Sequence, residues 1–373
     1  MLKSRFKILM NDFGAEPREL RERELAAVKR VIDSGWYVLG SEVESFEQEW
    51  ATACDAGHCV GVANGLDAIE IALRACGIGP GHEVVTTPMT AFATVLGILR
   101  AGAEPVLADI VCGTGLLCPA SVRRCIGPRC RAVMPVHLYG QVRDMDQWED
   151  LCGKLGLMLL EDCAQSHLAS WRGRSAGTFG SAGAFSFYPT KNLGAIGDAG
   201  ALVTQDGSLA DRARVLRNYG QSVRYHHPVI GLNSRLDEVH AAMLSARLAW
   251  LAAFTQRRRV IARMFREGIS HPDIELLDPP QEEEAHVHHL FVIRCQRREA
   301  LQAHLESCGI QTLIHYPVPV HLQESCLHLR RDPRGLHGSE SHAQTCLSIP
   351  CHPHLSDEEV RVVIEACNRF EQL

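Results

Sequence analysis

The sequence predicts an α/β protein with a mostly parallel sheet flanked by helices, followed by a smaller C-terminal α+β domain. Between residues 59 and 161, short apolar stretches alternate with amphipathic helical stretches. Polar or aromatic residues stand at or just beyond the ends of several predicted strands, where sheets of this kind bind ligands. A lysine, Lys191, lies in a glycine-rich loop after a later apolar strand. These three observations indicate an α/β fold with one ligand site.

The chain of 373 residues is long enough for a large domain over 1–245 and a small C-terminal domain over 246–373. Helical spacing predicts two helices ahead of the sheet, at 17–34 and 42–53. The predicted strands are 59–63, 83–87, 105–109, 131–137, 157–161 and 184–188. The helices predicted between them are 66–74, 90–102, 119–126 and 144–155. In the remainder we expect helices at 236–266 and 298–308, a strand at 289–293, and a last helix opened by the Ser356–Glu359 capping box.

Composition excludes several classes of protein. The net charge of -6 gives no basic footprint for nucleic acid, and no apolar run approaches the roughly 20 residues that span a bilayer. The fifteen cysteines are scattered without a Cys-x-x-Cys pair, and no export signal precedes them, so we expect reduced thiols in the cytoplasm. The histidine cluster at 286–289 has no partner at ligand spacing, so we expect no metal site.

Four features in chain order point to one cofactor. A strand breaks at Asn64 and Gly65 into a helix, a geometry that binds phosphate. Phe92 offers an aromatic plate, and Asp162 ends an apolar strand. Only five of the 38 basic residues are lysines, so Lys191 indicates an amine that must be able to lose its proton. Phosphate, ring, pyridine nitrogen and aldehyde are the parts of pyridoxal 5′-phosphate that such groups bind.

Each feature also has a structural interpretation. Asn-Gly occurs in turns for conformational reasons alone, Asp162 could cap a helix or pair with an arginine, and Lys191 could be a solvated loop residue. Their joint occurrence at the ends of strands in one predicted sheet favours the cofactor site.

Motifs along nearly the whole chain carry a family resemblance. They are 35–40, 62–68, 79–84, 102–106, 135–141, 161–166, 185–194, 197–202 and 231–237. In this order and spacing the sequence resembles the DegT/DnrJ/EryC1/StrS family of nucleotide-sugar aminotransferases. The resemblance implies the fold of type I pyridoxal-phosphate enzymes, with pyridoxamine 5′-phosphate as the alternate cofactor form.

The resemblance also implies roles for individual residues. Lys191 would bind the cofactor as a Schiff base, and Asp162 would pair with the pyridine nitrogen. Phe92 would stack on the ring, and Gln165 would hydrogen-bond its phenolic oxygen. The implied phosphate ligands are Asn64, Gly65, Leu66 and Ser186. Asn233, and less strongly Arg235, would reach the phosphate of a partner subunit, which implies a homodimer with shared sites.

One departure concerns the phosphate site, because many family members have a threonine where Leu66 stands, so only backbone N–H groups can serve there. Residues 109–117 form an unusual connection without a functional interpretation. Candidate substrate contacts are Tyr37, His137, Arg235, His315 and Tyr316, with structural packing an equal alternative for the last two.

The expected reaction moves an amino group from L-glutamate to a keto group of a nucleotide-linked sugar, in amino-sugar biosynthesis for an antibiotic or a polysaccharide. The pattern is most similar to the branch that acts on dTDP-3-keto-6-deoxyhexoses. A UDP-linked 3-keto sugar, a 4-keto sugar or a keto-cyclitol are alternatives. Related dehydratases have histidine in place of the lysine, so Lys191 argues against that activity. A non-catalytic regulatory or structural homologue is the alternative from a different class.

Overall fold

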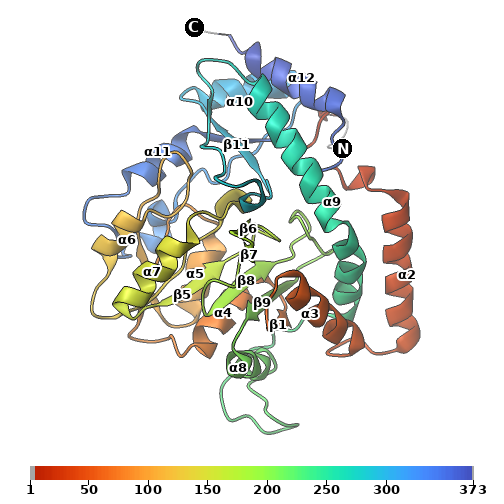
Figure 1. The fold of residues 1–373 in the computed structure, drawn as a ribbon, viewed down its shortest axis with the longest axis vertical. Helices are drawn as coiled ribbons and strands as arrows, with labels where there is room; N and C mark the ends of the chain where they lie inside the picture. Colours follow the sequence, from red (N-terminus) through yellow and green to blue (C-terminus); the bar gives the residue numbers. More distant parts are fainter. Residues whose placement is uncertain (1–4, 372–373) are drawn as a thin grey trace.

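Seven strands form the central sheet in the computed structural model, which describes residues 5–371 (Figure 1). Their order is β1-β9-β8-β5-β4-β2-β3. Strand β5 pairs in parallel with β4 and β8, whereas β9 runs antiparallel to both β1 and β8. The strands are β1 (His58–Val62), β2 (Glu83–Thr86), β3 (Glu104–Leu107), β4 (Cys130–Val133), β5 (Met158–Asp162), β8 (Ala182–Ser186) and β9 (Gly200–Thr204). The predicted mostly parallel α/β sheet is confirmed.

Helices cover both faces of this sheet because its strands are apolar on both sides. Along β5, Leu159 packs into a core with α3, α6 and α7, whereas Leu160 packs into a second core with α4 and α8. Parallel strands buried in this way are mainly apolar, as the sequence pattern indicated. The helices are α3 (Ser41–Ala53), α4 (Gly65–Ala75), α5 (Phe92–Arg100), α6 (Pro119–Cys125), α7 (Met145–Leu155) and α8 (Gly207–Arg217).

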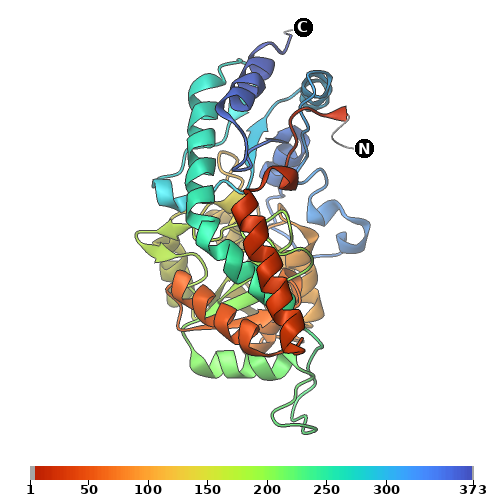
Figure 2. The ribbon, with the colours of Figure 1, turned by 90° about the vertical axis from the view of Figure 1, so that its right-hand side faces the viewer.

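The N-terminal helices pack against one long helix. Helix α2 (Arg18–Ser34) and α3 both contact α9 (Glu238–Gly268), which rises beside them toward the C-terminal part of the molecule (Figures 1 and 2). The buried Glu238 carboxylate accepts hydrogen bonds from the backbone N–H groups of Gly40 (2.7 Å), Glu42 (2.9 Å) and Val43 (3.1 Å). These bonds satisfy N–H groups at the start of α3, which a helix cannot pair internally.

A three-stranded antiparallel sheet, in the order β10-β11-β12, forms the centre of the C-terminal part. Phe265 of α9 lies in its core, and so does Ile8, which bridges to Ile310. The predicted domain boundary between 245 and 246 falls within α9 and stays a prediction. The elements here are β10 (Glu275–Leu276), β11 (Phe291–Arg294), α10 (Arg298–Ser307), α11 (His337–Thr345), β12 (Cys346–Ile349) and α12 (Asp357–Asn368).

Two further short strands, β6 (Ser170–Trp171) and β7 (Arg174–Ser175), pair with each other beside the sheet. Between α8 and α9 a loop projects from the body of the molecule (Figures 1 and 2). The capping box predicted from Ser356 and Glu359 is present at the start of α12. None of the helices within residues 5–371 is long and apolar enough to cross a membrane.

The unusual connection over 109–117 is a tight hairpin. Ile110 bridges to Leu117, and the N–H of Val111 donates to the carbonyl of Leu116 at 2.8 Å. Asp109 accepts bonds from the backbone N–H groups of Gly338 (2.9 Å) and Ser339 (2.8 Å) at the start of α11. The segment therefore joins the central sheet to the C-terminal part.

Candidate active site

Lys191 lies in the loop between β8 and β9, beyond the end of β8. Burial lowers the pKa of its amine from 10.5 to about 8, and the negative charge of nearby Asp162 partly opposes that effect. Burial also lowers the pKa of His167 to about 3 and of His315 to about 4, and the Lys191 charge adds to both shifts. These imidazoles are therefore neutral at pH 7. The negative charge that acts on Lys191 is that of Asp162.

Asp162 is the last residue of β5, and its carboxylate is buried, with 4% of the residue exposed. One oxygen accepts a hydrogen bond from the Thr94 hydroxyl at 2.6 Å, and the other accepts from the Ala164 N–H at 3.0 Å. A buried carboxylate held by two neutral donors keeps its negative charge available for a cationic partner. A protonated ring nitrogen would be such a partner.

The turn from β1 into α4 meets the end of β8 closely. Asn64 caps α4, its side chain accepting from the N–H of Asp67 at 2.8 Å. The next two N–H groups, of Gly65 and Leu66, have no partner within the described part of the chain. A Cβ on Gly65 would lie 2.6 Å from the Ser186 Cβ, so only glycine lets the helix start approach that serine. Two free N–H groups and a hydroxyl at a helix N-terminus form an anion site.

Gln165 is fixed from both sides. Its side-chain oxygen accepts from the Tyr139 N–H at 2.6 Å, which leaves its NH₂ group to donate to the Tyr316 hydroxyl at 3.2 Å. Burial raises the pKa of Tyr316 to about 12, and the Asp162 charge adds to the effect, so the phenol is protonated at neutral pH. The Tyr139 hydroxyl in turn donates to the His315 carbonyl at 2.6 Å. The residues around Asp162 thus connect to the C-terminal part.

The arrangement fits pyridoxal 5′-phosphate on the chemistry of its donors. An anion site at Gly65, Leu66 and Ser186 could hold the phosphate. A deprotonatable amine at Lys191 and a charged acid at Asp162 could hold the aldehyde carbon and the ring nitrogen. Phe92 opens α5 and is 38% exposed, so it has an open surface for a ring.

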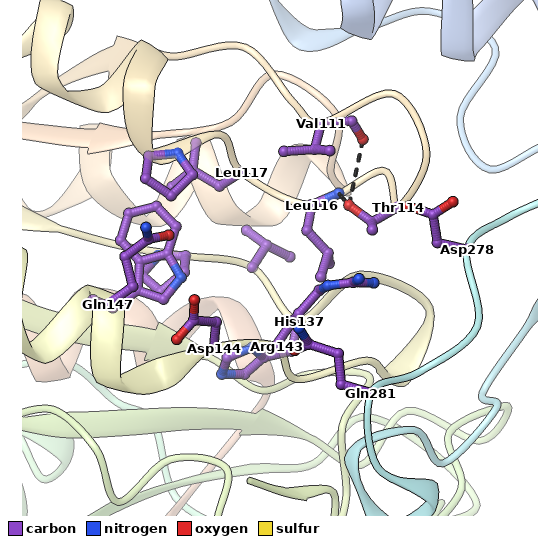
Figure 3. A pocket seen from close by; sticks show the side chains of 14 residues that line it. Val111, Thr114, Leu116, Leu117, His137, Arg143, Asp144, Gln147, Asp278 and Gln281 are labelled. Atoms are coloured by element: carbon purple, nitrogen blue, oxygen red, sulfur yellow. Dashed lines mark hydrogen bonds between the residues drawn. The ribbon is translucent and has the colours of Figure 1, made fainter.

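Other predicted contacts lie apart from this group. His137 donates or accepts through Nε2 with Glu161 at 2.9 Å, and it lines a cavity of about 180 Å³ with Leu116 and Arg143 (Figure 3). Neighbouring side chains point to opposite faces of a strand, so Glu161 and Asp162 lie on different faces of β5. His137 pairs with Glu161, on the face away from the Asp162 carboxylate. Its predicted role in substrate binding stays a prediction.

Three more predicted residues lie on the segments beside the projecting loop and α3. Tyr37 is 54% exposed, and Asn233 is also exposed. The Arg235 guanidinium donates to the Asn218 side chain at 3.2 Å and lies over the Tyr219 ring, 5.4 Å from its centroid. The predicted contact of Tyr37 with the substrate, and the predicted roles of Asn233 and Arg235 across a subunit interface, stay predictions.

A possible metal cluster is better explained by hydrogen bonding. Ligand atoms of His137, Glu161 and Cys163 lie within 4.8 Å of one another. The Glu161 carboxylate already accepts bonds from the N–H groups of Gly177 (2.9 Å), Phe179 (2.8 Å) and Gly180 (3.1 Å). Burial raises the Cys163 pKa well above its ordinary value, which disfavours the thiolate that binds metal.

Three residues of the site, Thr94, Tyr139 and His167, were not predicted from the sequence. Thr94 stands four residues after Thr90, a helical spacing that places both hydroxyls on one side of the start of α5. This spacing beside Phe92 was the available signal. Tyr139 and His167 act through neighbours that are distant in sequence: Tyr139 donates to Gln165, and His167 Nε2 bonds the Ser186 carbonyl at 2.9 Å. No local pattern indicates such contacts.

Comparison with known proteins places this geometry among aminotransferases. A dTDP-3-amino-3,4,6-trideoxy-alpha-D-glucose transaminase of Streptomyces venezuelae is 44% identical, covering 97% of this chain and 95% of the relative. A dTDP-3-amino-3,6-dideoxy-alpha-D-galactopyranose transaminase of Aneurinibacillus thermoaerophilus is 45% identical, covering 92% and 94%. The crystal structure of S. venezuelae DesV in complex with a ketimine intermediate matches with a TM-score of 0.94 at 44% identity, covering 99% of both chains.

The model of one protein family matches residues 18–368, which include every residue assigned to the site above. The fold and the resemblance inferred from the sequence are thereby confirmed. The chain belongs to the DegT/DnrJ/EryC1/StrS aminotransferase family and is a sugar transaminase.

Proposed function

We propose that the protein uses pyridoxal 5′-phosphate to transfer an amino group from L-glutamate to the 3-keto carbon of a dTDP-linked 6-deoxy sugar. The observation that carries the proposal is a buried Lys191 amine of lowered pKa that feels the negative charge of the buried Asp162 carboxylate. The relatives that act on dTDP-3-amino sugars support the choice of substrate.

When bound, the cofactor supplies an electrophilic carbon for the amino group and a ring that takes up carbanion charge. Lys191 would hold that carbon and Asp162 the ring nitrogen. Gly65, Leu66 and Ser186 would bind the phosphate, next to Asn64. Phe92 would cover one face of the ring.

Gln165 has one available orientation. Because its oxygen accepts from the Tyr139 N–H, its NH₂ group is the donor that faces Tyr316, and it would donate to the phenolic oxygen of the ring. Tyr316, protonated at neutral pH, offers an O–H group as a second donor in the same place. At this edge of the site, the side chains of Gln165 and Tyr316 therefore both offer hydrogen-bond donors.

Lys191 is also the proton carrier in the proposed mechanism. Once the amino donor has displaced it, the neutral Nζ would accept the proton from the alpha carbon of the donor and would deliver it to the carbon that Lys191 had held. A pKa of about 8 suits this task, because the amine is then neutral in a useful fraction at working pH and still binds a proton. Asp162 would hold the ring nitrogen in its protonated form.

Incubation with the cofactor tests whether this is a catalytic protein. We expect a visible absorbance band in the purified protein after addition of pyridoxal 5′-phosphate, and its loss in Lys191→Ala. A colourless wild-type protein would contradict the enzyme assignment and favour a non-catalytic homologue.

Glutamate-dependent amination across dTDP- and UDP-linked 3-keto and 4-keto sugars, together with a keto-cyclitol, tests the substrate. Turnover is expected with a dTDP-3-keto-6-deoxyhexose. Turnover confined to another substrate of this panel would contradict the dTDP-3-keto assignment while leaving the transaminase chemistry intact.

The proposed homodimer places Asn233 of the partner subunit at the phosphate. The exposed position of Asn233, which bridges to Asn218 between α8 and α9, supports this role. Mixing inactive Lys191→Ala chains with Asn233→Ala chains should restore one intact site in each mixed dimer. Activity equal to that of the unmixed variants would refute the shared site.

A further inference from the structure

A buried chain of hydroxyl groups ends on Asp162. The Thr90 and Thr94 hydroxyl oxygens lie 2.7 Å apart, and the Thr94 hydroxyl lies 2.6 Å from Asp162 Oδ2. Thr90 is 4% exposed, Thr94 1% and Asp162 4%. All three groups are therefore shielded from water.

The direction of hydrogen bonding in this chain follows from the acceptor at its end. An ionised carboxylate has no proton to donate, so the Thr94 hydroxyl must donate to Asp162. The same hydroxyl then has only its oxygen lone pairs left, so Thr90 donates to Thr94. Both donors point the same way, and bonds aligned in this manner strengthen one another in a buried site.

We propose that Thr94, supported by Thr90, is a positioning residue that holds the Asp162 carboxylate in one orientation and moderates its basicity toward the cofactor ring nitrogen. The other carboxylate oxygen is fixed by the Ala164 N–H at 3.0 Å. With one protein donor on each oxygen, the carboxylate cannot rotate without losing a charge-assisted bond.

The two threonines also connect Asp162 to Phe92. Thr90 and Thr94 flank Phe92 in sequence, and Phe92 opens α5. The segment before them is also held, because the Pro88 carbonyl accepts from the N–H of Val320 at 2.9 Å. The segment from Thr90 to Thr94 thus carries Phe92, which is proposed to touch the face of the ring. It also holds Asp162, which is proposed to touch the edge of the ring.

Removing the Thr94 hydroxyl has a predictable electronic effect. Without its donor, Asp162 becomes a stronger base and draws the shared proton from the ring nitrogen toward itself. With a less positive ring, the nitrogen by which Lys191 would hold the cofactor would keep its own proton to higher pH. His167, His289 and His315 also face Lys191, and the variants leave all three in place.

The test uses the holoenzyme and rests on the proposed function. Thr94→Val, which preserves shape, should raise the pH midpoint of the visible absorbance change by about half a unit or more. Its kcat should fall about tenfold, as expected for a lost bond to a charged group, with KM for the sugar nearly unchanged. Thr94→Ser should restore both. Thr90→Val should move both in the same direction by less, since it removes only the second hydroxyl.

Thr204→Val is the matched control. Thr204 is 1% exposed, and its hydroxyl donates to the Ser181 carbonyl at 2.7 Å at the opposite end of β9 from the site. If Thr94→Val matches this control in midpoint and kcat, the positioning role is refuted, although a Lys191-dependent band would leave the proposed function standing. If Thr94→Val does not fold, Thr90→Val decides, and an unchanged midpoint in that variant refutes the proposal.

Discussion

The depressed pKa of Lys191 gives a prediction about the protein without its cofactor. Burial lowers that pKa from 10.5 to about 8. At pH 7 about one Lys191 amine in ten is then neutral, roughly 300 times the neutral fraction of a lysine with the ordinary pKa. Only the neutral amine reacts with an electrophile. The reactivity of Lys191 should therefore rise with pH and level off above pH 8.

Replacing the acid sharpens this prediction. The charge of Asp162 raises the Lys191 pKa against the effect of burial. Asp162→Asn removes that charge while keeping the side-chain shape, so the inflection should move to lower pH. The variant would lose catalysis and yet contain a more reactive lysine at pH 7. A merely structural role for Asp162 would not produce this opposite pair of effects.

Pulsed labelling of the cofactor-free protein with an amine-reactive reagent measures both effects by mass spectrometry. Lys154 is an internal reference, because its side chain is 70% exposed in a surface ion pair with Asp150. The inflection for Lys191 is expected near pH 8 in the wild type and lower in Asp162→Asn. A Lys191 profile that coincides with that of Lys154, or an upward shift in Asp162→Asn, would refute the electrostatic reasoning.

Two further predictions concern packing at the site and stability. Gly65→Ala places a Cβ 2.6 Å from the Ser186 Cβ and should weaken cofactor binding about tenfold or more in equilibrium titration, whereas Gly153→Ala, with open space around it, should not. Glu238→Gln leaves at least one backbone N–H at the start of α3 without an acceptor and should lower the free energy of unfolding by roughly 1–3 kcal/mol in urea. Glu22→Gln, on an exposed ion pair with Arg18, should change that free energy by less than about 1 kcal/mol, and equal losses in the two variants would contradict this account.

Periodicity and turn chemistry predicted the elements that carry the site. The apolar run that ends at Asp162 forms β5, and the Asn64-Gly65 break opens α4. Both signals are local, because strand burial and helix capping depend on neighbouring residues. The strand predicted at 184–188 is shifted, since β8 ends at Ser186 and the chain turns there toward Lys191.

The parts that local signals did not predict depend on contacts between distant segments. Strand β9 was not among the predicted strands, and its place between β1 and β8 is set by antiparallel pairing with both. The sequence predicts His137 at the end of a strand like the site residues, but β4 ends at Val133, and His137 lies beyond it with its side chain on Glu161. Predicting this orientation requires the register of β4 against β5, which periodicity alone does not specify.

The continuity of α9 has a consequence for chimeric enzymes. At one end its Glu238 anchors the loop before α3, and in its second half its Arg258 donates to the Cys351 carbonyl at 2.7 Å. A helix of 31 residues is about 46 Å long, so one rigid rod fixes the spacing of both halves. A chimera that takes its C-terminal part from a relative should therefore be joined at Asp237, ahead of α9. The whole helix then comes from one parent.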